Sequence, residues 1–165
     1  KEVYMRFMRL FDKKNKEIGL PQYLVPYFIS SHPGCTLNNA VELAEFLRDI
    51  KHHPQQVQDF IPTPGSASTA MYYSGIDPET GKSVFVARNP HDKAMQRALM
   101  QYRNPKNRQL VLEALQKANR MDLVGSGPKC LIQTEDKNNK RGFNKPRNGK
   151  NDKKPAAKAN TRKRK

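Results

Sequence analysis

Apolar residues recur every three or four positions in two segments of the N-terminal third, which predicts two amphipathic helices. The first covers residues 1–18 and ends before Gly19, and the second follows Thr36, a suitable N-cap, and ends near His52-His53. We expect their buried faces to consist of Val3, Tyr4, Phe7, Met8, Leu10 and Phe11, and of Leu37, Ala40, Val41, Ala44, Leu47 and Ile50.

The same periodicity returns after Asn89-Pro90 and after Asn104-Pro105. Each pair offers an asparagine that can cap a helix and a proline that suits the first helical position, so two further helices are predicted. Their expected buried faces are Ala94, Met95, Ala98, Leu99 and Tyr102, and Leu110, Val111, Ala114, Leu115 and Ala118. The stretch SASTAMYYSG predicts a short helix or turn, and the glycines and proline of LVGSGPKCLI indicate a loop.

Three short segments are typical of β-strands. QYLVPYFI (residues 22–29) is nearly continuously apolar, as in a parallel strand covered on both faces, although Pro26 disfavours a central position. VQDFIPTPG (residues 57–65) and SVFVA (residues 83–87) predict two more strands. Strand, helix and strand in this order predict a parallel βαβ unit, in which both carboxyl ends lie on the same side.

Polar turns follow the first two predicted strands, in FISSHPGCT and DFIPTPGSAS. Ligands of parallel α/β proteins bind at the carboxyl ends of the strands. There the glycines allow close approach of the backbone, and Ser30, Ser31, Thr63 and Ser66 supply hydroxyl groups. We therefore expect a binding site where these two turns meet.

The positive charge of the chain is concentrated at its C-terminal end. Residues 134–165 contain 13 Lys or Arg against 3 Asp or Glu, which accounts for +10 of the net charge of +16. Phe143 is the only aromatic residue in this tail, so we expect residues 134–165 to be disordered. Such a cationic arm can bind RNA phosphates without reading sequence, or can simply act as a solvated extension.

Several features concern location and completeness. The sequence starts with Lys1 in an uncapped helical pattern, so we expect the chain to be the C-terminal piece of a longer protein. It contains no long apolar run and no signal peptide, which favours a cytoplasmic protein without a membrane partner. Cys35 and Cys130 lack close spacing, so we expect free thiols.

The turns also carry a resemblance to a known family. A strand that ends in a small residue before x-Pro-Gly-x-Thr and a helix, followed by a strand that ends in Pro-x-Pro-Gly, resembles the fifth and sixth strands of the radical S-adenosylmethionine (SAM) barrel. The stretch from VQDFIPTPGSASTAMYYSGIDP through FVARNPHDKAMQRALMQYRNP to GSGPKCLI is similar to the C-terminal region of bacterial YgiQ-type radical SAM proteins. The resemblance covers about residues 1 to 133.

This resemblance implies which residues contact the adenine of S-adenosylmethionine. They are Phe28, Ile29, Ser30 and Ser31 after the first strand, and Phe60, Ile61 and Pro62 after the second. Two positions depart from the family. Many members have glycine where this chain has Ser31, and many have glutamate where it has Cys35.

The resemblance further implies a 4Fe-4S cluster and S-adenosylmethionine in the full-length parent, which would be an enzyme. The family's CxxxCxxC loop is missing from this chain, and two cysteines cannot replace its three thiolates. We therefore expect no cluster ligated by this chain alone and no catalysis by it. Its partner would be the N-terminal half of the barrel, which carries the cluster.

Single residues with reactive side chains allow two interpretations. Cys35 could contact substrate, but a packed turn residue is favoured. His32 could donate a proton, and a structural turn histidine is the favoured alternative. His52-His53 could suggest a metal pair, but a structural role is favoured, because adjacent helical residues point in different directions.

These observations define an α/β fold class: C-terminal strands and helices of a radical SAM (β/α) barrel, a helical extension and a disordered basic tail. The expected domains are 1–65 (barrel part), 66–133 (YgiQ-type extension) and 134–165 (tail). The expected function is that of a radical SAM enzyme portion with unknown substrate and reaction. The alternative is a non-catalytic basic module associated with RNA or ribosomes.

Overall fold

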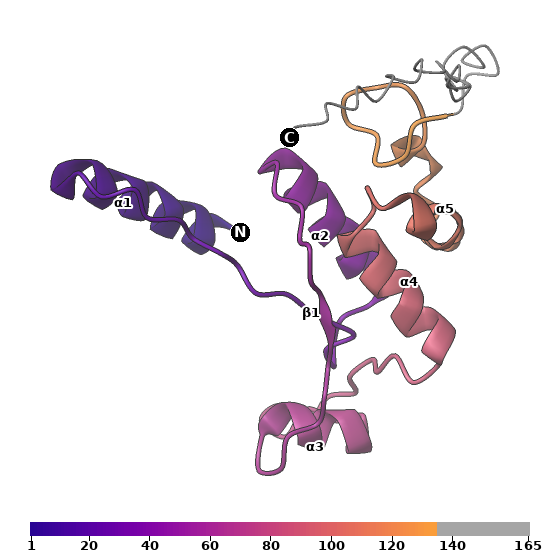
Figure 1. Ribbon diagram of the computed structural model, residues 1–165. Helices are drawn as coiled ribbons and strands as arrows, with labels where there is room; N and C mark the ends of the chain where they lie inside the picture. The colour runs from indigo at the N-terminus through magenta and orange to yellow at the C-terminus, as the bar shows by residue number, and fades with distance from the viewer. Residues whose placement is uncertain (135–165) are drawn as a thin grey trace, which may run out of the picture. The chain divides into compact units, whose positions relative to one another are not determined.

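The computed structural model describes residues 1–134, and the predicted disordered tail lies outside the described residues except for Thr134. Figure 1 shows the order of the elements along the chain. The helices are α1 (Glu2–Ile18), α2 (Leu37–Asp49), α3 (Ala67–Ser74), α4 (Pro90–Met100) and α5 (Arg108–Lys117), with 3-10 turns at Pro105–Asn107 and Met121–Leu123. The strands are β1 (Ile29–Ser30) and β2 (Gln58–Asp59).

The helix boundaries follow from local capping residues. The Thr36 hydroxyl accepts a hydrogen bond from the Asn39 backbone N–H at 3.3 Å, and the Asn39 side chain accepts one from the Thr36 N–H at 3.0 Å. Asn89 caps α4 by accepting from the His91 N–H at 2.8 Å. Gly19 ends α1 with φ of +67°, the left-handed conformation that glycine adopts without steric cost. These predicted caps are confirmed, although α2 ends at Asp49, before His52-His53.

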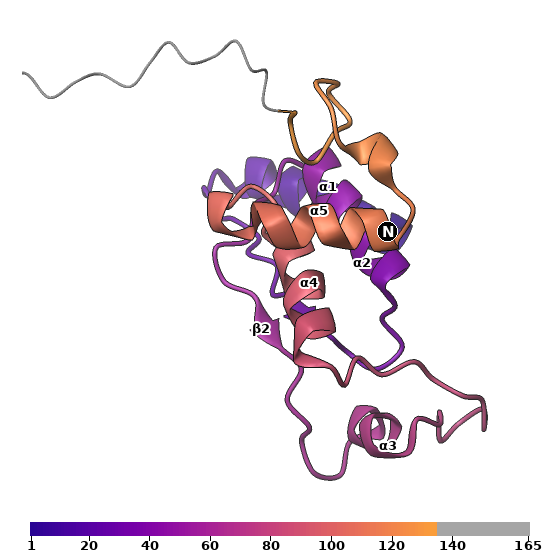
Figure 2. The ribbon, with the colours of Figure 1, turned by 90° about the vertical axis from the view of Figure 1, so that its right-hand side faces the viewer.

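The hydrophobic core lies where α2, α4 and α5 pack against one another (Figure 2). Its fully buried side chains include Val41 from α2, Leu99 from α4 and Leu115 from α5. The predicted inward faces of these helices are therefore confirmed in their central positions. Ala94, Leu110 and Ala118, at the margins of those faces, are only partly buried.

The C-terminal segment of the described chain completes this core with Leu123, Leu131 and Ile132. Between them, the predicted GSGP loop is confirmed and is closed by a hydrogen bond from the Gly125 N–H to the Ile132 carbonyl at 2.9 Å. Arg120 fixes the segment to α2, because its guanidinium donates to both carboxylate oxygens of Glu45 at 3.0 Å.

Helix α1 departs from the sequence-based expectation. Its apolar stripe was predicted to be buried, but α1 has no buried residue within the described chain. Val3, Phe7 and Leu10 are 84%, 52% and 55% exposed. Its closest aromatic contact is the edge of Tyr4 against Phe46 of α2, with 6.0 Å between ring centroids. The prediction of the helix was right and that of its burial was wrong, because periodicity does not supply a partner surface.

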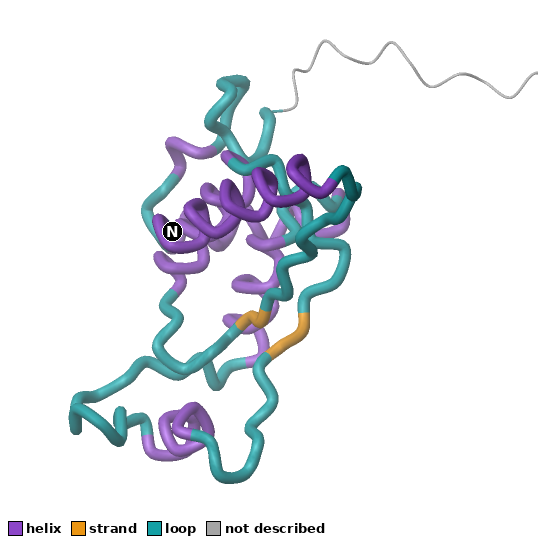
Figure 3. Tube along the Cα trace, turned by 90° about the vertical axis from the view of Figure 1, so that its left-hand side faces the viewer, coloured by secondary structure: helices purple, strands orange, loops and turns teal. Residues whose placement is uncertain are grey.

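The two strands form a parallel pair, as the βαβ order predicted (Figure 3). Ile29 pairs with Gln58, and Ser30 pairs with Asp59. The expected length of the first strand was wrong, because β1 contains two residues instead of the eight of residues 22–29. β2 lies inside the predicted segment 57–65 and also contains two residues. Pro26 has no backbone N–H to donate, and Pro62 and Pro64 follow β2. Few backbone groups therefore remain to form further hydrogen bonds between the two strands.

The segment before β1 is covered on one side only. Tyr23, Val25 and Tyr27 are 84%, 85% and 71% exposed, whereas the residues between them are partly buried. This alternation is typical of extended backbone with one covered face, so the expectation of cover on both faces was wrong for the described residues.

The third predicted strand, residues 83–87, is absent from the sheet in the described structure. It forms a single antiparallel bridge, Ile76 with Ser83, at the base of the Asp77–Lys82 turn. The Phe85 carbonyl then accepts a hydrogen bond from the Gly34 N–H at 2.8 Å. The segment therefore supports the His-Pro-Gly turn instead of adding a strand, which the β-branched composition of SVFVA could not reveal.

The described chain is thus a mixed α/β fold with five helices and a two-stranded parallel sheet. Helix α4 contacts both strands. None of the helices within residues 1–134 combines the length and apolar character needed to cross a bilayer.

Candidate functional site

The carboxyl ends of β1 and β2 are joined by a partly buried polar contact. The Ser30 hydroxyl, which is fully buried, donates a hydrogen bond to Asp59 Oδ1 at 2.5 Å. Asp59 Oδ2 accepts from the Arg97 guanidinium of α4 at 2.7 Å. One carboxylate therefore connects both strand ends to the helix that packs on them.

Ser31, the next residue, has an unusual backbone conformation. Its φ is +59°, in the left-handed region that favours glycine. The side chain is 1% exposed, and its hydroxyl has no hydrogen-bond partner in the described structure. This position therefore combines backbone strain with an unsatisfied buried oxygen, a pairing that is often found at functional sites.

The His-Pro-Gly turn follows directly. The Cys35 N–H donates to the His32 carbonyl at 2.9 Å, which closes the turn. Gly34 has φ of +88° and needs the conformational freedom of glycine. The turn leaves the His32 side chain at the surface beside the Phe60 ring, with 5.1 Å between the two ring centroids.

His32 has a defined orientation. Its Nδ1 lies 2.8 Å from the Pro33 carbonyl oxygen, which can only accept, so Nδ1 carries a proton. Its Nε2 lies 3.0 Å from the Ser68 hydroxyl of α3, which donates to it when the imidazole is neutral. These two contacts orient the imidazole between the turn and α3, at the mouth of the two turns.

Cys35 is turned toward the core instead of toward the surface. Burial raises the pKa of its thiol above the ordinary value, which disfavours the reactive thiolate. Cys35 packs against the core cluster, and both cysteines are free, as predicted. These facts support the packing interpretation of Cys35.

The residues that the family resemblance assigned to adenine lie on two adjacent backbone segments. The register brings Phe28 to Ser31 beside Phe60 to Pro62, through hydrogen bonds from the Gln58 N–H to the Phe28 carbonyl and from the Phe60 N–H to the Ser30 carbonyl. Their side chains do not share one surface. Ile29 and Ile61 are 44% and 63% exposed, whereas Ser30 and Ser31 are buried.

The two assigned aromatic residues have their own ring partners. Phe60 also contacts Tyr72 of α3, at 5.7 Å between ring centroids, and Phe28 packs on His52 at 5.8 Å. The assignment of all seven residues to adenine stays a prediction.

Sequence reasoning missed the residues that connect the site to its surroundings. They are Asp59, which contacts Ser30, and Arg97 and Ser68, which contact Asp59 and His32. The guanidinium of Arg88, an exposed residue, donates to the Tyr72 and Tyr73 carbonyls at 2.9 and 3.0 Å at the end of α3. The one available signal was the position of Asp59, a charged residue inside the second predicted strand segment, residues 57–65.

Metal-binding groups do not gather in the described part of the chain. Within residues 1–134, no cluster of three or more His, Cys, Asp or Glu side chains could hold a metal ion. His52 contacts Phe28 and His53 contacts Tyr102, so the two histidines engage different partners, although they lie beyond the end of α2 and not on a helix. A four-iron cluster needs several thiolates, and the half-buried Cys35 thiol does not suit that role. The residues of this chain do not fit such a cluster.

The fold and the strand-end site define the class of this chain as a mixed α/β protein with a parallel βαβ unit and a polar site at its carboxyl end. Residues 55–165 match the family described as domain of unknown function (DUF3362), and the chain belongs to that family.

Its relatives include proteins named UPF0313 protein. The chain is 55% identical over 140 residues to one from Methanosarcina mazei, which covers 85% of this chain and 22% of the relative. It is 56% identical over 137 residues to one from Methanosarcina acetivorans, and this match covers 83% of this chain and 18% of the relative. A relative from Clostridium perfringens is 53% identical over 137 residues, and this match covers 83% of this chain and 20% of the relative.

The chain thus spans about a fifth of the length of these relatives, which come from both bacteria and archaea. No solved structure matches the chain.

Proposed function

We propose that this chain is the C-terminal part of a radical SAM enzyme of the YgiQ type. In this proposal β1 and β2 are neighbouring strands of the barrel, and their carboxyl ends form part of the pocket for the adenine of S-adenosylmethionine. The rest of the protein holds the 4Fe-4S cluster, and the substrate is not identified. On its own the chain helps to bind and orient S-adenosylmethionine and does not catalyse a reaction. The whole protein works in the cytoplasm.

The parallel pairing of β1 and β2 around α2 is the observation that carries this proposal. It places the two turns of the family resemblance side by side at one sheet end, as a barrel requires. Ser31 adds support. It adopts the left-handed conformation at the position where many family members have glycine.

Exposed apolar surfaces also favour a larger assembly. Parallel sheets are normally buried on both faces, yet Tyr23, Val25 and Tyr27 are exposed on one side of the segment that leads into β1. The apolar stripe of α1 is exposed as well. The remaining four-fifths of the relatives' length could supply the missing cover.

The exposed isoleucines suggest how the site would work. Ile29 and Ile61 can pack on the flat faces of adenine, while the backbone of residues 30 and 31 offers polar groups to its edge. The hydrogen bonds of Asp59 with Ser30 and Arg97 hold the two strand ends in place.

Binding of S-adenosylmethionine to the full-length product of this reading frame tests the proposal. Replacing Ile61 with serine removes apolar contact, so we expect the dissociation constant to rise about tenfold. Ile76→Ser is the matched control, because Ile76 is also an exposed isoleucine, at 48%, and lies outside the site. Calorimetry measures both. Equal effects of the two substitutions would contradict the proposed pocket.

A non-catalytic RNA- or ribosome-associated module is the second candidate, and the charge of residues 134–165 favours it. Binding of RNA through this tail should weaken steeply with salt and should vanish when the chain is truncated after residue 133. Binding of S-adenosylmethionine should survive both changes, so the two candidates are distinguishable.

A further inference from the structure

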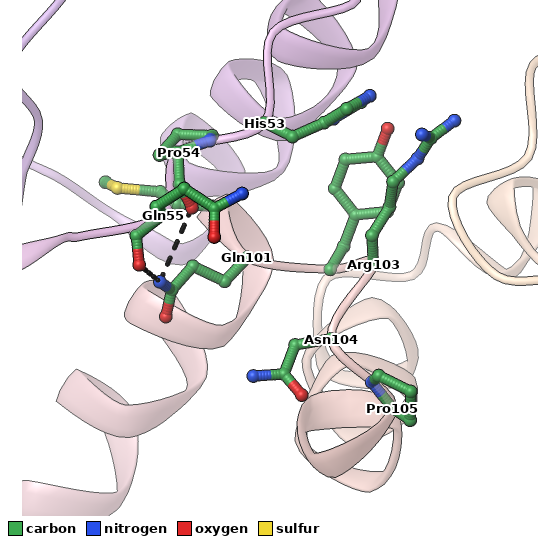
Figure 4. Close-up of a pocket in the computed structure, with 9 residues that line it drawn as sticks. His53, Pro54, Gln55, Gln101, Arg103, Asn104 and Pro105 are labelled. Carbon is green, nitrogen blue, oxygen red and sulfur yellow. Dashed lines mark hydrogen bonds between the residues drawn. The ribbon is translucent and has the colours of Figure 1, made fainter.

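A cavity lies away from the strand-end site, between the end of α2 and the connection from α4 to α5 (Figure 4). Its volume is about 310 Å³, which is within the range of small-molecule sites. The Gln101 amide forms one wall by donating to the Gln55 carbonyl at 2.9 Å. Met100, Pro54 and Pro105 add apolar surface.

Three polar groups of this cavity lack partners. Within the described residues, no hydrogen bond or ion pair engages the Arg103 guanidinium, the His53 imidazole or the Tyr102 hydroxyl. His53 contacts the Tyr102 ring at 6.1 Å between centroids. Figure 4 shows the His53 and Arg103 side chains extending toward the same side of the cavity.

The cavity lining contains a positively charged side chain, Arg103, and no negatively charged one. No Asp or Glu is among the residues that line the cavity. Burial lowers the pKa of the His53 imidazole, and Arg103 and His52 lower it further by acting on it electrostatically. Protonated His53 therefore lies near the positive charge of Arg103, and no carboxylate is among the groups that shift its pKa, an imbalance that an anion would correct.

We propose that this cavity binds the phosphate group of a small organic molecule. Arg103 forms two parallel hydrogen bonds to phosphate oxygens, and protonated His53 donates a third. The Tyr102 hydroxyl donates to the same group, and the apolar wall accommodates the organic part. The site is independent of the proposed binding of S-adenosylmethionine, because it shares no residue with the strand ends.

Titration of the full chain by NMR tests this site through the His53 ring signals. Inorganic phosphate and phenyl phosphate are the probes, with chloride at equal ionic strength as reference. A bound phosphate stabilises the charged imidazole, so both probes should raise the pKa of His53 by about 0.5 to 1. Tighter binding of phenyl phosphate would identify a phosphate ester as the ligand class, and equal binding would identify free phosphate as sufficient.

Matched variants separate a built site from diffuse surface charge. Arg103→Gln should weaken phosphate binding about tenfold, because it removes the bidentate contact. Lys106→Gln removes a nearby cation that does not line the cavity and should leave the affinity unchanged. The proposal is overturned if phosphate leaves the His53 pKa as it is in chloride, or if both variants weaken binding equally.

Discussion

Ser30 and Asp59 meet across the ends of two parallel strands, 29 residues apart in the sequence, with 2.5 Å between the serine hydroxyl and the carboxylate. Ser30 is fully buried, whereas the side chains of Asp59 and Arg97 are 34% and 45% exposed. The hydroxyl therefore depends on this carboxylate for its hydrogen bond. The Arg97 contact lies nearer to solvent, which weakens its contribution to stability.

This difference predicts unequal effects of two substitutions. Asp59→Ala leaves the buried Ser30 hydroxyl without an acceptor and should lower the free energy of unfolding by about 1 to 3 kcal/mol. Arg97→Ala removes only a partly exposed ion pair and should cost about 1 kcal/mol or less. Urea unfolding of both variants measures the difference. A larger cost for Arg97→Ala would show that the ion pair, and not the buried hydroxyl, dominates the contact.

Glycine substitutions at the neighbouring residues Ser31 and Ser30 should have different effects on stability. Ser31→Gly relieves left-handed backbone strain and removes an unpartnered hydroxyl, which offsets the added flexibility of the unfolded chain. Its stability should be unchanged or about 1 kcal/mol higher. Ser30→Gly loses a buried hydrogen bond and should cost about 1 to 3 kcal/mol. If Ser31→Gly destabilises as much as Ser30→Gly, the strain at Ser31 has been misjudged.

The lowered pKa of His53 predicts a pH dependence of stability. The imidazole has its ordinary pKa of 6.5 in the unfolded chain and a lower one in the folded chain. The unfolded state therefore binds the proton more readily, and stability falls as the pH drops below 6.5 toward the folded-state pKa.

His53→Gln should remove this part of the acid destabilisation. The gap in urea midpoint between the variant and the unchanged chain should shift in favour of the variant between about pH 7.5 and pH 5. A gap that stays constant over this range would mean that the pKa of His53 is the same in both states.

The helices were predictable because their signals are local. Thr36 and Asn89 cap helices with their own side chains, and Gly19 ends one through its own backbone conformation. The inward faces of α2, α4 and α5 followed from periodicity, because these helices cover one another.

The strands and the site were less predictable because they depend on distant partners. Residues 22–28 have strand-like composition, but β1 pairs with β2 at two residues only. Residues 83–87 also have a strand-like composition, but they support the turn at Gly34 instead of joining the sheet. The contacts of Asp59 with Ser30 and Arg97 join residues that are 29 and 38 positions apart, which no spacing rule anticipates.

Reductive cleavage of S-adenosylmethionine is the most direct test of the proposed function. The full-length product of this reading frame, purified without oxygen and reconstituted with iron and sulfide, should bind a 4Fe-4S cluster and release 5′-deoxyadenosine when reduced. A reconstituted protein that holds no cluster and releases no 5′-deoxyadenosine would contradict the radical SAM assignment.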